Sequence, residues 1–325
     1  MTVCIAAVCN IGPDRPAYVV AASDRMITIG DIEYEPDQTK AVELGTKTIG
    51  LLAGDMQVHA AIIPKTMDAL KELVSGRDPP RLTVEEIAEA YAKQFAYYRR
   101  TLAEREILVP RGMDFERFAR LQATLPHYQV KELDARIATH VLDASAIIAG
   151  LDHTGASIYV IRDPGVAESF NTPFFACIGT GRDIAATQFM VAKYEKRWRL
   201  ADALWLTFSA KARAEVAGGV GPKTDLIAIG PEGFIYAGEE RKDELYALFR
   251  SVVARENAAQ REAVETLEAY IRPRPDEAQA QSQDQHVSVP AGQDQPPKET
   301  MLHDPPISSS SKKPSRARRR EPPSS

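Results

Sequence analysis

The order of strand-like and helical stretches is the feature that most restricts the fold of this chain. Four apolar strand-like runs come first and a helical block follows; then come three runs, two helices, two runs and a last long helix. Parallel sheets need strands that alternate with crossover helices, and this chain groups its strands instead. The grouping predicts an α+β fold with two stacked antiparallel sheets, each covered by helices on its outer side. The strand runs are residues 2–9, 17–23, 40–44, 48–54, 144–152, 156–163, 174–179, 224–230 and 234–238.

Apolar periodicity and capping signals predict the helices. Thr83 is a predicted N-cap, because Glu86 stands three residues later at the capping-box position. Pro64 lies inside a helical pattern and predicts a kink or a restart, and Pro126 predicts a break. The predicted helices are residues 56–74, 82–106, parts of 113–143, 182–198, 201–217 and 240–271.

A change of composition near Arg272 divides the chain into a folded part and a tail. Residues 1–271 have the apolar content of one globular domain. Residues 272–325 are rich in Pro, Gln, Asp and Ser, and they cannot bury enough apolar surface to offset their chain entropy. We expect this tail to be disordered. Its basic run, Lys312–Arg320, could contact nucleic acid or an acidic partner, but a solvated tail is the favoured interpretation.

Charge, cysteine content and hydropathy exclude several classes of protein. The net charge of −5 is no global signature of nucleic-acid binding. The three cysteines, an odd number without a CxxC pair, argue against a disulfide framework. No basic stretch followed by an apolar run opens the sequence, and no apolar run reaches the roughly 18 residues of a membrane span. The sequence therefore predicts a cytoplasmic protein without a membrane segment.

The familiar cofactor and metal motifs are incomplete. GGVGPKTD is similar to a phosphate-binding loop, but Pro222 interrupts the required Gly-Lys-Ser/Thr ending. IGTGRDIAA has a G-x-G but lacks the third glycine of a dinucleotide site. The histidines never fall at i, i+4 with a carboxylate between them, and no G-x-S-x-G elbow occurs. We therefore expect no cofactor and no metal.

The opening residues, MTVCIAAVCN, point to a different chemistry. Removal of Met1 would leave Thr2 with both a hydroxyl and a free α-amine. Such an amine has an ordinary pKa of about 7.7–8.0, so near neutral pH it can serve as the base for its own hydroxyl. The alternative is that Thr2 only opens an edge strand, where threonine is common. Cys4 is a minor candidate nucleophile, because its exposure would require removal of three residues.

Three further residues could complete such a site. Asp24 ends the second strand run, Lys40 precedes the third, and Gly54 ends the fourth. A lysine near the amine would lower the amine's pKa and favour the developing alkoxide, and a carboxylate would hold that lysine in place. A strand end made of small residues can present a backbone N–H to an oxyanion. Taken singly, Asp24 could be a turn residue and Lys40 a solvated edge charge.

In combination these residues resemble the proteasome β-subunit family, and especially its bacterial relatives that form simple two-ring proteases. The separations of 16 positions from Asp24 to Lys40 and 14 from Lys40 to Gly54 are similar to the family pattern. The first hairpin connection is longer than the family's. CIGTGRDIAA resembles the family's Gly-Ser-Gly turn, with Thr180 at the serine position. Glu215, in EVAGGVGPKTDLIAI, is the best match to the family's acidic residue before a small-residue turn.

The resemblance covers roughly residues 2–240 and implies a four-layer αββα sandwich. It implies hydrolysis of peptide bonds through an acyl-enzyme, with Thr2 as nucleophile and base. Lys40 would then tune the amine, Asp24 would hold Lys40, and Gly54 would supply an oxyanion N–H. The resemblance also implies a homo-oligomeric ring and a polypeptide substrate, with any ATP-dependent unfoldase supplied by a separate chain.

Several features depart from the family pattern. Arg25 directly follows Asp24 and could compete with Lys40 for the carboxylate. Residues 99–143 form a helical insertion longer than simple family members carry, and the final helix and tail are also extra.

Two other functions remain open. The chain could be an N-terminal-nucleophile amidohydrolase acting on a small amide, or a non-catalytic scaffold similar to the family's α subunits. Those α subunits usually carry a helix ahead of the first strand, and no helical pattern precedes it here. In a hydrolase, Met26, Ile27 and Asp55 would border the substrate pocket.

Overall fold

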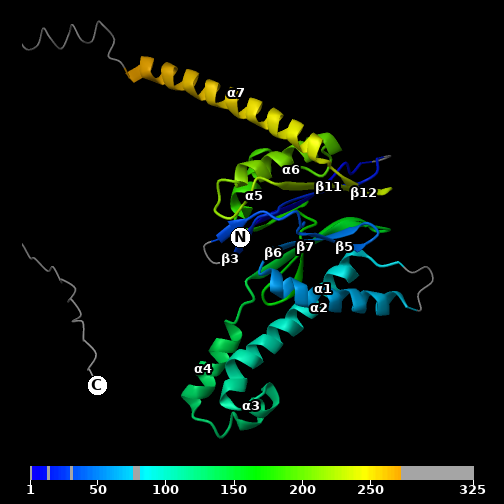
Figure 1. Ribbon diagram of the computed structural model, residues 1–325, viewed down its shortest axis with the longest axis vertical. Coiled ribbons are helices and arrows are strands. Elements are labelled where there is room, and N and C mark those ends of the chain that lie inside the picture. The colour runs from blue at the N-terminus through cyan, green and yellow to red at the C-terminus, as the bar shows by residue number, and fades with distance from the viewer. Residues whose placement is uncertain (1, 13–14, 30–31, 76–80, 272–325) are drawn as a thin grey trace, which may run out of the picture. The chain divides into compact units, whose positions relative to one another are not determined.

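The computed structural model describes residues 2–12, 15–29, 32–75 and 81–271 (Figure 1). Its contacts divide the chain into two units, Met1–Gln260 and Arg261–Ser325. The second unit contributes only the last residues of the final helix to the described part. The predicted tail, residues 272–325 with its basic run, lies outside the described residues.

Two five-stranded antiparallel sheets form the centre of the first unit, in agreement with the predicted α+β class. Strand order is β10-β1-β2-β11-β12 in the first sheet and β5-β6-β7-β8-β9 in the second. The first sheet contains β1 (Val3–Cys9), β2 (Tyr18–Asp24), β10 (Phe175–Gly179), β11 (Thr224–Gly230) and β12 (Gly233–Tyr236). The second sheet contains β5 (Ala41–Gly45), β6 (Thr48–Gly54), β7 (Ala144–Asp152), β8 (Gly155–Arg162) and β9 (Val166–Ser169).

Strand β1 of the first sheet is apolar and buried at every position because both faces of the sheet are covered there. Cys4, Ala6 and Val8 of β1 pack with side chains of β6, β7 and β8 in the second sheet. Val3 and Ile5 point the other way and pack against helices. This division follows from the period of two, which sends successive side chains to opposite faces of a sheet. A buried aliphatic side chain of this size contributes about 1.5–3 kcal/mol to stability.

Two pairs of helices cover the outer faces of the sheets (Figure 1). These are α1 (Met56–Val74) and α2 (Val84–Ala103) on the second sheet, and α5 (Arg182–Val191) and α6 (Leu200–Ala214) on the first. In α2, the buried rings of Tyr91 and Phe95 belong to one apolar cluster with Ile148 and Ile161 of the second sheet. In α5, Phe189 packs with Ile5 of the first sheet.

The helix boundaries confirm the local signals with two corrections. Thr83 and Glu86 form the predicted capping box of α2, and α4 begins directly after Pro126. Of the two expectations at Pro64, the restart is wrong, because α1 runs unbroken from Met56 to Val74 through it. Buried side chains on both sides of the proline hold the helix to the sheet and outweigh the lost hydrogen bond. Helix α5 ends at Val191, earlier than predicted, because Lys193 adopts a left-handed conformation with φ of 51°.

Three short strands were not predicted from the sequence. They are β3 (Ile27–Ile29), β4 (Ile32–Tyr34) and β9. The first two pair only with each other, and Ile32 and Tyr34 of β4 are exposed. Strands of three or four residues have too few positions to show an alternating pattern.

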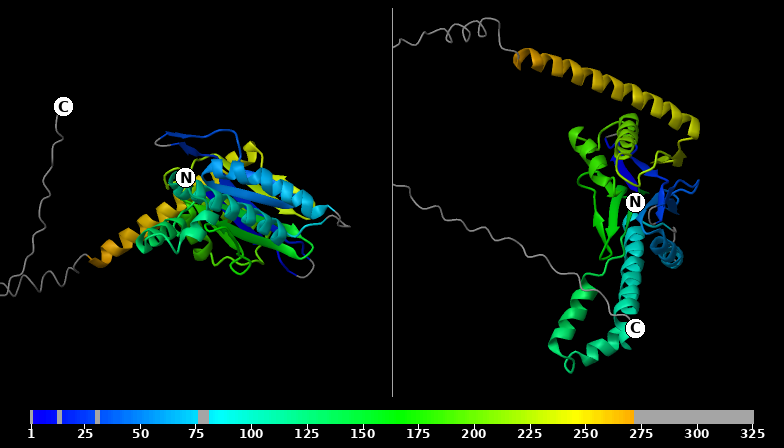
Figure 2. Two further views of the ribbon diagram at one scale, coloured as in Figure 1. Left: turned by 90° about the horizontal axis from the view of Figure 1, so that it is seen from below. Right: turned by 60° about the vertical axis from the view of Figure 1, so that its left-hand side comes forward.

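Residues 99–143, the predicted helical insertion, comprise the end of α2 and several short helices (Figure 2). The helices are η1 (Glu104–Leu108), η2 (Val109–Arg111), α3 (Phe115–Leu121) and α4 (His127–Ala138). They share a small core of their own, which includes Leu108, Phe118 and Leu133. Arg99 ties this segment to the rest of the unit, because its guanidinium bonds the carbonyl of His140 and lies 3.4 Å from Asp163.

The final helix, α7 (Glu239–Ile271), packs its first turns on α6. The Tyr246 ring lies edge-on to Phe208, with 4.8 Å between the ring centroids. None of the helices within the described residues combines the length and the hydropathy of a membrane span.

Candidate active site

Thr2 lies directly ahead of β1, and its main chain is held by the turn that follows β10. The nitrogen of Thr2 donates to Thr180 Oγ1 at 3.2 Å, and the nitrogen of Gly181 donates to the carbonyl of Thr2 at 3.2 Å. Gly179 has a φ of 88°, and a Cβ there would lie 2.2 Å from that carbonyl. The turn therefore needs its glycine to approach Thr2 this closely.

The hydroxyl of Thr2 contacts both Lys40 and Asp24. Lys40 Nζ donates to Thr2 Oγ1 at 2.6 Å and to Asp24 Oδ2 at 3.0 Å. The hydroxyl of Thr2 in turn donates to Asp24 Oδ1. All three side chains are buried, with exposed fractions of 1%, 4% and 0% for Thr2, Lys40 and Asp24. A buried ammonium that donates to a hydroxyl oxygen stabilises negative charge that develops on that oxygen.

Backbone groups from three segments hold the carboxylate of Asp24. Val3 N donates to Oδ1 at 2.8 Å, and Met26 N and Gly221 N donate to Oδ2 at 2.9 and 3.4 Å. A buried carboxylate is tolerated only when such donors and a counter-ion replace its water shell. Asp24 therefore fixes the position of Lys40 beside Thr2.

Arg25 does not compete with Lys40 in this geometry. Its Nε donates to Asp225 Oδ1 at 2.9 Å, and its guanidinium lies 3.6 Å from a carboxylate oxygen of Glu239. Asp225 belongs to β11, which pairs with β2 alongside. A second carboxylate in the neighbouring strand thus satisfies Arg25.

Gly54 ends β6 in a conformation that only glycine adopts easily. Its φ is 89°, and a Cβ at this position would lie 2.0 Å from the carbonyl of Asp143. Two residues earlier, Leu52 N donates to the carbonyl of Lys40 at 3.0 Å. Because N–H groups two positions apart leave a strand on the same side, the N–H of Gly54 points toward the same side, past the end of β5. That side holds Lys40 and Thr2.

Two cavities meet at Thr2 and Gly54. One, of about 400 Å³, is lined by Lys40 and by residues from the β2–β3 connection and the start of α1, including the predicted pocket residues Met26, Ile27 and Asp55. The other, of about 560 Å³, is bordered by the ends of β7, β8 and β10 and also includes Thr180. The nucleophile candidate and the oxyanion candidate thus line both cavities, together with Asp143.

Glu215 is the one predicted site residue that the fold does not bring to Thr2. Its carboxylate accepts from Lys211 Nζ at 2.8 Å and from the Tyr246 hydroxyl at 2.6 Å. Lys211 is fully buried, and burial lowers its pKa. Its ammonium also donates to the carbonyl of Gly221 at 2.6 Å. Glu215 therefore reaches the site only indirectly, through the loop whose Gly221 N–H bonds Asp24.

Lys211, Gly221 and Tyr246 were not identified from the sequence. A signal for Lys211 exists, since it follows Phe208 by three positions and so shares the buried face of α6. A lysine on such a face needs partners, but their identity depends on the loop after α6 and on α7.

The minor candidate Cys4 is unsuited to nucleophilic attack. Its thiol is fully buried and donates to the carbonyl of Leu52 at 3.4 Å. Burial, together with the charge of Asp24, raises the pKa of Cys4 to about 12. The reactive thiolate is therefore scarce near neutral pH.

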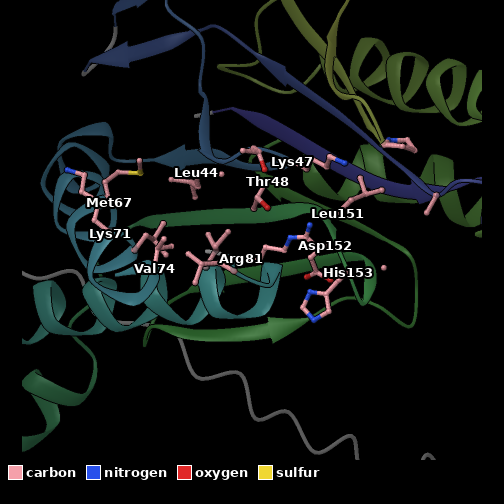
Figure 3. Close-up of a pocket in the computed structure, with 18 of the residues that line it drawn as sticks. Leu44, Lys47, Thr48, Met67, Lys71, Val74, Arg81, Leu151, Asp152 and His153 are labelled. Carbon is pink, nitrogen blue, oxygen red and sulfur yellow. The ribbon is translucent and has the colours of Figure 1, made fainter. Parts of the chain in front are cut away.

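A larger cavity, of about 980 Å³, lies at the other end of β6, where Thr48 rather than Gly54 lines it (Figure 3). Its walls are mostly apolar and come from β5, α1 and the β7–β8 turn. Two of its charged groups have local partners: Lys71 pairs with Asp68, and Asp152 accepts from the nitrogen of Val84. No group of three His, Cys, Asp or Glu side chains suited to a metal ion occurs within the described ranges.

Comparison with known proteins assigns this chain to no family. No protein-family model matches the chain, and no curated protein matches it. Function must therefore be inferred from the geometry around Thr2.

Proposed function

We propose that this protein is a threonine-type peptidase of the N-terminal-nucleophile class, built as a four-layer αββα sandwich similar to a proteasome β subunit. The observation that carries the proposal is the buried contact of Lys40 Nζ with Thr2 Oγ1, 2.6 Å long, beside a fully buried Asp24. The layer order is supported by the two stacked sheets and by the helices that cover their outer faces.

The proposed reaction begins with cleavage of the bond before Thr2, which frees its α-amine. The amine accepts the proton of the hydroxyl, and Oγ1 attacks the carbonyl carbon of the substrate. The ammonium of Lys40 stabilises the charge on Oγ1 in the approach to the transition state, and the N–H of Gly54 stabilises the new oxyanion. The α-ammonium then gives its proton to the departing amine, which leaves an ester on Thr2.

Hydrolysis of that ester repeats the same steps with water. The α-amine accepts a proton from water as the hydroxide adds to the ester carbonyl, and it returns the proton to Oγ1 as the acid product leaves. Thr180 has a positioning role in this scheme, because its Oγ1 lies 3.2 Å from the nitrogen of Thr2. Glu215 has no direct role, since its carboxylate is engaged by Lys211 and Tyr246.

A polypeptide substrate suits assembly into a homo-oligomeric ring, with any ATP-dependent unfoldase as a separate partner. A small amide is the second candidate substrate. It is favoured by the size of the cavities at Thr2, about 400 and 560 Å³, which lie in the range of small-ligand sites. Turnover of peptides longer than about six residues would support the peptidase, and turnover of acylated small amines alone would support the amidohydrolase.

The test is the intact mass of the purified protein with and without a peptide epoxyketone. The hydroxyl of Thr2 adds to the ketone and its amine opens the epoxide, so the adduct has the summed mass of protein and probe. We expect a chain that begins at Thr2 and gains one probe mass, and no adduct on Thr2→Ala. A chain that retains residues before Thr2 would instead support the scaffold alternative.

A further inference from the structure

A buried histidine–tyrosine pair lies directly behind Gly54. His59, in the first turns of α1, is fully buried, and so is Tyr91 of α2. His59 Nε2 lies 2.9 Å from the carbonyl of Ala53, and His59 Nδ1 lies 2.6 Å from the Tyr91 hydroxyl. Because a carbonyl only accepts, Nε2 carries the proton. The hydroxyl of Tyr91 then donates to Nδ1 and fixes that tautomer.

The carbonyl of Ala53 and the N–H of Gly54 belong to the same peptide group. That group is planar and trans, so the two bonds point in opposite directions and cannot rotate independently. A hydrogen bond that fixes the carbonyl of Ala53 therefore also fixes the direction of the N–H of Gly54. Ala53 and Gly54 also pair with Ser145 and Ala144 of β7, so the hydrogen bond from His59 adds a second restraint to a peptide that the sheet already holds.

We propose that His59 and Tyr91 are positioning residues for the oxyanion donor of this site. His59 holds the Ala53–Gly54 peptide so that its N–H points at the oxygen of the reacting carbonyl, and Tyr91 holds the histidine tautomer that makes this contact. The proposal rests on the proposed function, because it gives a role to the N–H of Gly54. A pair that only filled the core would affect stability without affecting the chemical step.

The test compares the rate of inactivation by the peptide epoxyketone in four variants of the full chain. His59→Leu removes the donor to Ala53, whereas His59→Gln retains an N–H donor in a side chain of related length. Tyr91→Phe retains the ring and removes the hydroxyl. Thr66→Val is the matched control, because Thr66 is also buried on α1 but its hydroxyl bonds the carbonyl of Ile62 in its own helix.

We expect His59→Leu to lower the maximal inactivation rate about 10- to 100-fold while the half-saturating probe concentration changes less than threefold, since an oxyanion donor acts in the transition state. In His59→Gln, the logarithm of the rate should return at least a third of the way from its His59→Leu value to its wild-type value. Tyr91→Phe should show a smaller loss than His59→Leu, and Thr66→Val should react at the wild-type rate. Melting temperatures accompany each rate. The nitrogen-15 spectrum of the His59 imidazole, with Nε2 protonated, accompanies the rates of the wild type, Tyr91→Phe and Thr66→Val.

Three outcomes would overturn the inference. A wild-type rate in folded His59→Leu would show that the pair does not orient the oxyanion donor, while the adduct itself would uphold the proposed function. Equal rate losses in His59→Leu and Thr66→Val would assign the effect to stability. A wild-type protein that forms no adduct with any probe would remove the proposed function and this inference together.

Discussion

Replacement of Lys40 by methionine should separate the catalytic from the structural role of its charge. Met is close to Lys in length and keeps the apolar stem, so that Lys40→Met removes the ammonium with little change of shape. The ammonium makes two charge-assisted contacts, 2.6 Å to Thr2 Oγ1 and 3.0 Å to Asp24 Oδ2. The two contacts have different roles. The first stabilises the attacking oxygen, so its loss lowers reactivity; the second neutralises a buried carboxylate, so its loss lowers stability.

The magnitudes follow from these two contacts. Loss of a hydrogen bond from a charged donor is worth about 1.5–3 kcal/mol, so the inactivation rate should fall at least about tenfold and up to about 100-fold. Removing one partner of a buried ion pair costs about 3–5 kcal/mol of stability. The lower end applies here, because three backbone N–H groups still bond Asp24. A second change, Asp24→Asn in the Lys40→Met background, removes the unpaired charge.

The assay pairs urea unfolding with the epoxyketone inactivation rate. Lys40→Met should lose about 3 kcal/mol in the free energy of unfolding and most of its reactivity. The double variant Lys40→Met/Asp24→Asn should regain part of that stability but none of the reactivity. Reactivity within threefold of wild type in Lys40→Met, or its return in the double variant, would refute the role assigned to the ammonium.

Three further predictions concern other parts of the site. Gly54→Ala should abolish adduct formation and lower the free energy of unfolding by at least about 1–3 kcal/mol. The cause is that the alanine Cβ would meet the carbonyl of Asp143 at a φ of 89°. Intact mass checks the adduct, and calorimetry checks the stability. Burial lowers the pKa of His59, so below about pH 6.5 the unfolded chain binds a proton that the folded chain does not. The free energy of unfolding should therefore fall as pH falls, by at most about 1.4 kcal/mol per pH unit. Urea unfolding from pH 7.5 to 5 should show this change of the free energy of unfolding with pH. In His59→Gln the slope should be smaller by the contribution of one proton. Glu215→Gln should react with the probe within threefold of the wild-type rate. It should unfold at a lower urea concentration, because the substitution weakens the cluster around Lys211. A 100-fold rate loss would restore Glu215 as a catalytic candidate.

Much of the fold could be predicted because its signals are local. The apolar runs gave the positions of β1, β2, β5 and β6 within one or two residues, and the capping box at Thr83 marked the start of α2. Strands β1 and β2 have runs of apolar residues at successive positions, which already indicated cover on both faces. Where local signals misled, as at Pro64, tertiary packing outweighed the intrinsic preference of the residue.

The partners of polar residues are the part that local signals could not predict. Arg25 bonds Asp225, 200 positions away, and Tyr246 bonds Glu215 from a helix that the sequence showed only as extra. His59 looked like an ordinary residue of an apolar helix face, because its partners, Ala53 and Tyr91, meet it only after α1 and α2 have packed. Short-range periodicity carries no record of such pairings.

The sequence by itself determined which residues could do chemistry and where each stands on its strand. Thr2 precedes the first strand, Asp24 ends the second, and Lys40 precedes the third. Only the tertiary structure decided that these three meet, because Lys40 leads into a strand of the second sheet, whereas Thr2 and Asp24 adjoin or end strands of the first. The apolar layer between the sheets brings these strand ends together, and burial there turns the ammonium to the hydroxyl and the carboxylate beside it, its two hydrogen-bond partners among the described residues.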